Sequence, residues 1–218
     1  MKKISACLGA ITAAMLLFAC AGCSEQTFTE KSYTSDENAV TEIAIDAEDR
    51  EIEVSASEDG RVHIGWFDSK EEYLDLSVSD GVLTVTLCYD KDWTDYIGVK
   101  PAAEYRRIKV KVPEGVAVFS ASTTNEDITV TALSCTESVS LASNGGCLVF
   151  ERLNAGASIS LTAKNGDITG SVAGSMEDFS LSCTIKKGDC NLPTSWEGGP
   201  KSLSVDCNNG DIEVTFVQ

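Results

Sequence analysis

Apolar and polar side chains alternate along much of the chain after residue 39. This alternation of period two is typical of a β-strand that buries one face, and no segment shows the longer spacing of an amphipathic helix. The sequence therefore predicts an all-β fold. Between residues 116 and 218 the inward positions are Phe119/Ala121/Thr123, Val139/Leu141/Ser143, Ile159/Leu161/Ala163, Leu181/Cys183/Ile185 and Leu203/Val205/Cys207.

A short motif punctuates these strands. Asn-Gly-Asp-Ile occurs at residues 165–168 and 209–212, and degraded copies lie around Glu126, Gly145 and Gly188. The second residues of the copies are 19, 21, 22 and 22 residues apart. A fixed period of this size predicts a single-stranded β-solenoid with about 20–22 residues per coil, stacked in chain order. After each turn the inward residues resume at Ile128/Val130, Cys147/Val149, Ile168, Cys190/Leu192 and Ile212/Val214.

The repeated Gly and Asp residues are interpreted as turn residues. Glycine supplies positive φ at a tight corner, and aspartate accepts hydrogen bonds from its own turn. The alternative is a row of carboxylates that binds calcium, but known calcium solenoids use a nine-residue repeat. We therefore expect structural roles and no metal at Gly166, Asp167, Gly188, Asp189, Gly210 and Asp211.

The solenoid is expected to span residues 39–218 as one domain, with less regular coils over 39–115 and regular coils over 116–218. Several alternating segments of the first part are separated by Asp, Gly or Pro turn signals. Ser79-Asp80-Gly81 stands between two of these segments and predicts a hairpin or a corner. No second shift in composition divides the domain.

The first residues have the features of an export signal. Lys2 and Lys3 precede an apolar run over residues 4–18, and small residues follow it. The sequence Cys20-Ala21-Gly22-Cys23 resembles the lipobox of bacterial lipoproteins, which implies a signal peptide over 1–22 and lipidation of Cys23. Lipidation at Cys20, or simple secretion, is the alternative. Residues 23–38 are polar and are expected to form a flexible tether. The protein is thus expected to be exported and lipid-anchored in the cell membrane, facing outside.

Charge narrows the classes of partner. The chain has 17 basic and 34 acidic residues, a net charge of −17, and loss of Lys2 and Lys3 with the signal peptide makes it −19. Nucleic acid requires basic patches, so we expect no nucleic-acid partner. Contact with the membrane is expected only through the lipid anchor, because anionic lipid repels an acidic domain.

One family resemblance is specific. The stretch "RRIKVKVPEGVAV" is followed by "TTNEDITV" and then by "KNGDI" and "NNGDI" coils. This series resembles the bacterial candidate-adhesin domains of unknown function that are built from β-strand repeats. The resemblance covers Val40 to Gln218 and implies a right-handed β-helix on an exported protein. It brings no catalytic or binding residues with it.

Catalytic and cofactor motifs are not found. The one histidine, His63, is expected on a surface or edge strand, and the mature chain has neither a zinc-binding Cys/His set nor a phosphate-binding loop. We expect no cofactor and no enzyme activity. Six further cysteines are expected to be mostly free, although an exported protein also allows disulfides. They are Cys88, Cys135, Cys147, Cys183, Cys190 and Cys207.

Two loops are candidates for ligand contact. Residues 88–107 contain Trp93 and Tyr96 among acidic residues, and residues 192–202 contain Trp196. Exposed aromatic rings suit contact with a glycan or a protein, although the first loop could instead fold over the open coils and bury its rings. The last strand, "GDIEVTFVQ", has no evident cap, so homodimerisation through pairing of end strands, or addition of a partner's strand, is an open alternative.

The functional hypothesis is a non-catalytic cell-surface lipoprotein that presents a binding surface, with adhesion as its role. One alternative is an envelope scaffold or sensor that acts with a membrane partner. A carbohydrate-active enzyme is the other alternative, because two carboxylates can suffice for glycoside cleavage.

Overall fold

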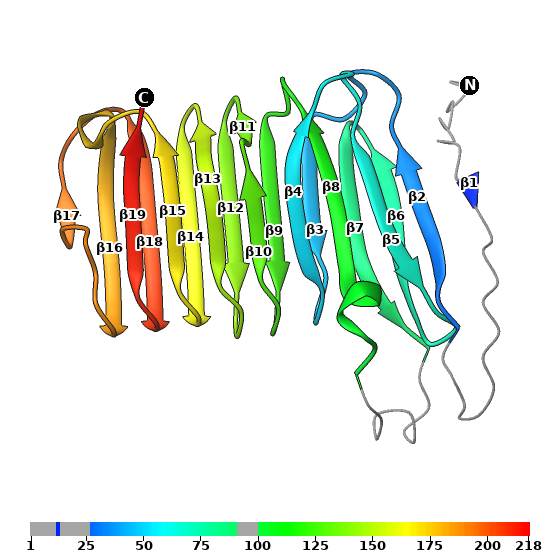
Figure 1. The fold of residues 1–218 in the computed structure, drawn as a ribbon. Helices are drawn as coiled ribbons and strands as arrows, with labels where there is room; N and C mark the ends of the chain where they lie inside the picture. The colour runs from blue at the N-terminus through cyan, green and yellow to red at the C-terminus, as the bar shows by residue number, and fades with distance from the viewer. Residues whose placement is uncertain (1–11, 14–26, 91–99) are drawn as a thin grey trace.

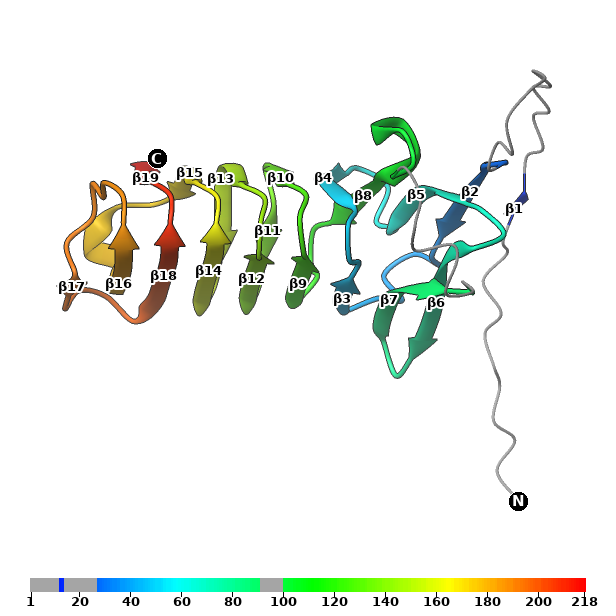
Figure 2. The same ribbon diagram turned by 90° about the horizontal axis from the view of Figure 1, so that it is seen from below.

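The computed structural model describes residues 12–13, 27–90 and 100–218, and this part of the chain is all-β. Within the described residues, helical structure is limited to two short 3-10 turns, η1 (Ala103–Arg106) and η2 (Met176–Asp178). Two long sheets lie face to face and enclose one apolar core (Figures 1 and 2). The predicted fold class, all-β, is confirmed.

The first sheet has ten strands, of which β11 (Ser134–Cys135) pairs with β13 beside the main path. The order across this sheet is β1 (Thr12–Ala13), β2 (Thr29–Thr34), β5 (His63–Asp68), β8 (Arg107–Pro113), β4 (Glu51–Ser57), β10 (Ile128–Thr131), β13 (Leu148–Ala155), β15 (Ile168–Ala173) and β19 (Ile212–Val217).

The second sheet has nine strands and covers the other side of the core (Figure 2). Its order is β17 (Ser195–Trp196), β16 (Phe179–Lys187), β18 (Lys201–Asn209), β14 (Ser158–Asn165), β12 (Ser138–Ser143), β9 (Val118–Thr123), β3 (Glu42–Asp46), β7 (Val82–Tyr89) and β6 (Glu72–Ser79).

Each repeating coil runs along a strand of the second sheet, turns a corner, and returns along a strand of the first sheet. The pairs β9/β10, β12/β13, β14/β15 and β18/β19 follow this path, and their strands are parallel to those of the neighbouring coils. The register aligns equivalent inward residues, so that apolar side chains stack in rows through the core. One such row in the first sheet is Ile108, Ile52, Ile128, Leu148, Ile168 and Ile212, all at most 2% exposed.

The coils do not stack in chain order, which corrects the sequence-based expectation. Near the C-terminal end, β18 lies between β14 and β16, so the last coil of the chain is inserted before the preceding one. Near the other end, β3 lies between β7 and β9, and β4 lies between β8 and β10. A repeat of 20–22 residues specifies the shape of a coil but not which coil is its neighbour.

The predicted alignment of one coil was shifted by one residue. Leu148 pairs with Ile168, which makes Gly146 and not Gly145 the counterpart of Gly166. Leu148 and Phe150 are therefore buried, while Val149 is 44% exposed. The expected inward positions of Cys147 and Val149 were wrong because Gly145 and Gly146 give two ways of placing the turn.

The N-terminal part is built from hairpins as well as coils. Strands β6 and β7 form an antiparallel hairpin whose turn residues Asp80 and Gly81 have φ of 52° and 83°, as the Asp-Gly signal predicted. Strand β5 pairs antiparallel with β2 and β8. Residues 29–34 thus form a sheet strand, although the flexible tether was expected to extend to residue 38. Strand β1, inside the predicted signal peptide, pairs with the other side of β2.

The C-terminal end of the stack is partly closed. Strand β17 pairs antiparallel with the outer side of β16. On the first sheet, residues 189–192 run beside the outer side of β19. There the N–H of Asn191 donates to the carbonyl of Ile212 (3.1 Å), and the N–H of Ile212 donates to the backbone carbonyl of Asp189 (2.9 Å). The expectation that the last strand is uncapped was therefore wrong for the first residues of β19.

Candidate functional site

The predicted Asp row lies at the corners between the two sheets. On successive coils the corner residues are Asp127, Cys147, Asp167, Asp211 and Asp189. The backbone N–H of Asp211 donates to Oδ1 of Asp167 (2.8 Å), and the N–H of Asp189 donates to Oδ1 of Asp211 (2.8 Å). The carboxylates of Asp167 and Asp211 therefore each bind the backbone of the next coil. The expectation that each Asp caps its own turn was wrong in this respect.

Cys147 takes the place of an aspartate in this series. Its backbone N–H donates to Oδ1 of Asp127 (2.7 Å), and its sulfur accepts a bond from the N–H of Asp167 (3.4 Å). In all four contacts the side chain of one corner residue accepts a hydrogen bond from the backbone N–H of the corner residue on the next coil. The corner series therefore holds neighbouring coils together. Within residues 12–13, 27–90 and 100–218, no group of three or more His, Cys, Asp or Glu residues could hold a metal ion.

The three corner glycines lie close to the backbone of a neighbouring coil, and two of them also have positive φ. Gly188 and Gly210 have φ of 124° and 150°, in the region that glycine adopts most readily. A Cβ on Gly166 would lie 2.2 Å from the carbonyl oxygen of Gly146 on the adjacent coil, and a Cβ on Gly188 or Gly210 would lie 2.1 or 2.4 Å from a carbonyl oxygen of its neighbouring coil. The prediction of positive φ therefore holds for two of the three glycines, while Gly166 is required by the close approach of two backbones.

The aromatic candidates are only partly placed. Trp93 and Tyr96 lie outside the described residues. Trp196 lies on β17 at the end of the stack and is 39% exposed. In the remainder of the first loop, Tyr105 stacks on Phe28 with ring centroids 4.3 Å apart and meets Phe67 edge-on at 5.3 Å. Part of that loop therefore packs against the first strands, as the alternative interpretation held.

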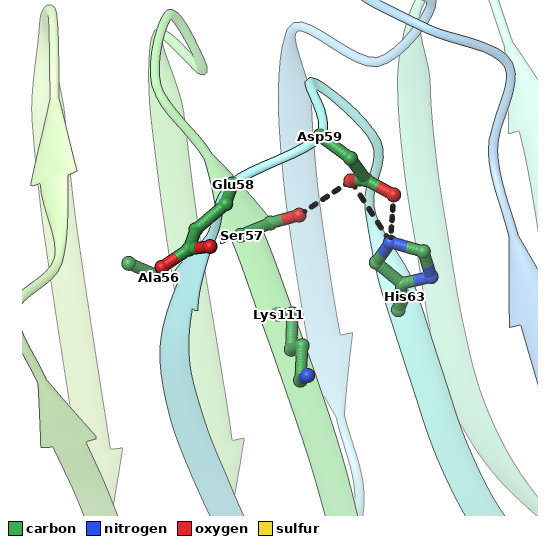
Figure 3. A pocket seen from close by; sticks show the side chains of 6 residues that line it. All are labelled: Ala56, Ser57, Glu58, Asp59, His63 and Lys111. Carbon is green, nitrogen blue, oxygen red and sulfur yellow. Dashed lines mark hydrogen bonds and ion pairs between the residues drawn. The ribbon is translucent and has the colours of Figure 1, made fainter.

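An open hollow of about 380 Å³ lies on the outer side of the first sheet (Figure 3). Strand β4 ends at its rim, the following turn supplies acidic side chains, and β5 and β8 supply basic ones. Lys111 lies directly across from His63 on the neighbouring strand. The lining residues are Ala56, Ser57, Glu58, Asp59, His63 and Lys111.

Asp59 organises one side of this hollow. Nε2 of His63 lies 3.0 Å from each carboxylate oxygen of Asp59, and the hydroxyl of Ser57 donates to Oδ1 (2.8 Å). The hydrogen bonds from His63 and Ser57 hold the pKa of Asp59 at about 2, below its usual 3.8. Nδ1 of His63 lies 3.1 Å from Oγ1 of Thr34 on β2.

The contacts of His63 bear on whether the hollow could hold a nucleophile and its general base. Such a pair needs a serine, threonine or cysteine within hydrogen-bond reach of the imidazole. Ser57 donates to the carboxylate of Asp59 and does not contact the ring, whereas Oγ1 of Thr34 lies 3.1 Å from Nδ1 of His63. His63 lies half-exposed near the edge of the first sheet, as predicted.

Two lysines beside the hollow have no carboxylate partner among the described residues. Lys109 and Lys111 are exposed on β8, while the neighbouring Arg107 is held by Glu51 (2.9 Å) and Glu53 (3.0 Å). In a chain with net charge −17 these two ammonium groups form a local cationic row on the outer face. Sequence reasoning missed them, although the strand "RRIKVKV" alternates basic and apolar residues.

Comparison with known proteins identifies the family. A family model described as Toastrack DUF4097 matches residues 40–218, which is most of the chain. The chain belongs to this family. No curated protein matches the sequence.

Solved structures were compared with this chain, and one of them shares its fold. A candidate cell adhesion protein from Clostridium sporogenes superposes with a TM-score of 0.66 at 9% identity, covering 88% of this chain and all of that one. A candidate adhesin from Bacteroides fragilis gives a TM-score of 0.37 at 12% identity, with 88% and 98% covered. At such identities the first likeness shows the fold alone. In the described residues no helix has the length and apolar character to cross a bilayer.

Proposed function

We propose that this Toastrack protein is a non-catalytic binding protein on the outer surface of a bacterial cell, anchored by a lipid on Cys23, and that it acts in adhesion. The cationic row of Lys109 and Lys111 carries the proposal. These side chains project beside an open hollow and have no carboxylate partner within the described residues. A glycan or protein that offers carboxylate, sulfate or phosphate groups fits this surface.

The rigidity of the stack supports a role in display. Equivalent strands pair in register across both sheets, and the corner aspartates tie each coil to the next. A surface held this firmly loses little conformational entropy when it binds a ligand. The candidate contacts Trp93, Tyr96 and Trp196 extend the proposed surface to the two loops. We further propose that the regular coils wind as a right-handed single-stranded β-helix, the usual hand of parallel crossovers.

The experiment is a binding screen of the full chain against immobilised anionic and neutral glycans and matrix proteins. It compares the protein with Lys109→Ser/Lys111→Ser and with a matched control, Lys186→Ser/Lys187→Ser, which removes the same charge from the other end. Loss of two ion pairs at roughly 0.7 kcal/mol each weakens binding about tenfold. We expect that loss only in the first variant, and equal binding with calcium or chelator.

Other outcomes would redirect the proposal. If Trp93→Ala or Trp196→Ala abolished binding while the Lys109→Ser/Lys111→Ser variant still bound normally, the ligand contact would lie on the loops instead. Absence of any ligand, together with capture of a membrane protein by crosslinking on cells, would favour the envelope scaffold or sensor. Cleavage of a glycan during the screen would replace the binding role with carbohydrate-active catalysis.

A further inference from the structure

Two cysteines lie next to each other at the closed end of the stack. Cys183 is buried on β16, and Cys190 is half-buried just after the corner that follows that strand. Their sulfur atoms are 3.4 Å apart. They are seven positions apart in sequence, and the two β16 residues nearest the corner, Lys186 and Lys187, lie between them.

Both residues are held in place by their backbones. The N–H of Cys183 donates to the carbonyl of Thr194 (2.9 Å), on the segment that continues into β17. Cys190 makes a parallel bridge with Ile212 of β19, and the N–H of Leu192 donates to the sulfur of Cys190 (3.3 Å). The two thiols therefore remain close together while the end of the stack stays folded.

We propose that Cys183 and Cys190 form a disulfide when the protein is exposed to an oxidising thiol–disulfide environment. Closing the bond requires the sulfurs to move from 3.4 Å to about 2.0 Å. Rotation of the half-buried Cys190 side chain can supply this shift without moving β16. The bond joins β16 to residues 189–192, the segment that covers the edge of β19.

A small disulfide such as oxidised glutathione can act as the oxidant. The Cys190 thiolate attacks one of its sulfurs and expels a glutathione thiolate, which leaves a mixed disulfide on Cys190. The Cys183 thiolate then attacks Sγ of Cys190 and expels the second glutathione. Two protein thiols are oxidised, one external disulfide is reduced, and the two protein protons pass to the released thiols. Burial raises the pKa of Cys183 to about 12, so the half-buried thiol reacts first.

The other thiols do not compete for these partners. Cys207 is on the strand next to Cys183, but it pairs in register with Ile185 and is offset by two residues. The sulfur of Cys207 is directed to the carbonyls of Gly166 (3.5 Å) and Gly210 (3.6 Å). Cys147 lies three coils from Cys190, roughly 14 Å by strand spacing, which exceeds disulfide reach.

The test has a cellular arm and a solution arm. The full chain is isolated from the envelope after free thiols are trapped with N-ethylmaleimide, and in parallel it is equilibrated in glutathione buffers of rising redox potential. Trypsin cleaves after Lys186 and Lys187, between the two cysteines. We expect peptide 165–186 to be joined to peptide 188–201, and reduction to separate them. The solution arm does not depend on where the protein resides, nor on any ligand.

Variants distinguish a specific bond from general oxidation. Cys183→Ser and Cys190→Ser are each expected to abolish the crosslink, whereas Cys147→Ser retains it. Oxidation should raise the melting temperature by about 5 °C in the unmodified protein and not in either serine variant of the pair. Full alkylation of both cysteines in the most oxidising buffer, or a crosslink of peptide 165–186 to 202–218, would overturn the proposal.

Discussion

The side chain of Asn191 pairs with the backbone of Val214 as a neighbouring strand would. Its Nδ2 donates to the carbonyl oxygen of Val214 (2.9 Å), and its Oδ1 accepts a bond from the N–H of Val214 (3.0 Å). Val214 lies on β19, the last strand of the first sheet. One side-chain amide thereby satisfies both the N–H and the carbonyl of Val214, which on an uncovered edge strand would be open to pairing with another molecule.

Replacing Asn191 should open this edge. We expect Asn191→Ala to lower the free energy of unfolding by about 1–2 kcal/mol, because two backbone groups lose their partner. The variant should also self-associate as its concentration rises, which light scattering after size-exclusion chromatography measures. Asn191→Asp keeps the acceptor and loses the donor, so its stability should lie between that of the unmodified protein and that of Asn191→Ala. A monomeric Asn191→Ala would show that this edge is protected in another way.

The corner aspartates can be tested at Asp167. Asp167→Ala removes the acceptor for the N–H of Asp211 and should destabilise the protein by about 1 kcal/mol, since the exposed N–H can turn to water. Asp167→Asn keeps an acceptor oxygen and should recover most of this loss. Urea denaturation measures both, with Glu213→Ala as the exposed acidic control. Stabilisation of the unmodified protein by calcium would contradict a purely structural corner.

A buried ion pair joins the corner after β3 to the first residue of β6. Arg50 and Glu72 are 4% and 5% exposed and are hydrogen-bonded to each other. Arg50→Met removes a charged partner of the buried Glu72 and should destabilise the protein by about 3–5 kcal/mol. The double variant Arg50→Met/Glu72→Leu should recover much of that loss in chemical denaturation. A double variant that was less stable than Arg50→Met would contradict this expectation.

The depressed pKa of Asp59 predicts a pH effect in the acid range. The pKa is about 2 in the folded protein against an ordinary 3.8. The contribution of its carboxylate to stability is therefore present above about pH 4 and is lost as the pH falls toward 2. His63→Ala should raise the Asp59 midpoint toward 3.8 in an NMR titration of carboxyl carbons. Asp178, whose pKa is lowered by the Ser175 N–H, should not shift.

The sequence predicted the content of the coils better than their arrangement. Alternation identified Phe119, Ile159 and Leu203 as inward residues, and all three are buried. It could not show that β18 enters between β14 and β16, because neighbouring coils have nearly interchangeable inward faces. The corner bonds were missed for the same reason, since Asp167 meets Asp211 and not Asp189 only in the observed order.

The hollow beside His63 was not predictable from any local pattern. His63 and Lys111 come together because β5 runs antiparallel to β8, a pairing of strands 48 positions apart. The sequence gives no register for that pairing. Trp93 and Tyr96 remain predictions from the sequence.

The insertion of the last coil has a mechanical consequence. Strand β18 has neighbours on both sides, and the first residues of β19 lie between β15 and residues 189–192. Tension applied at Gln218 would first separate the uncovered end of β19 and would then have to pull β18 away from neighbours on both sides. The last coil of the chain is thus held next to two other coils, and the outermost strands of the second sheet at this end, β16 and β17, come from an internal segment.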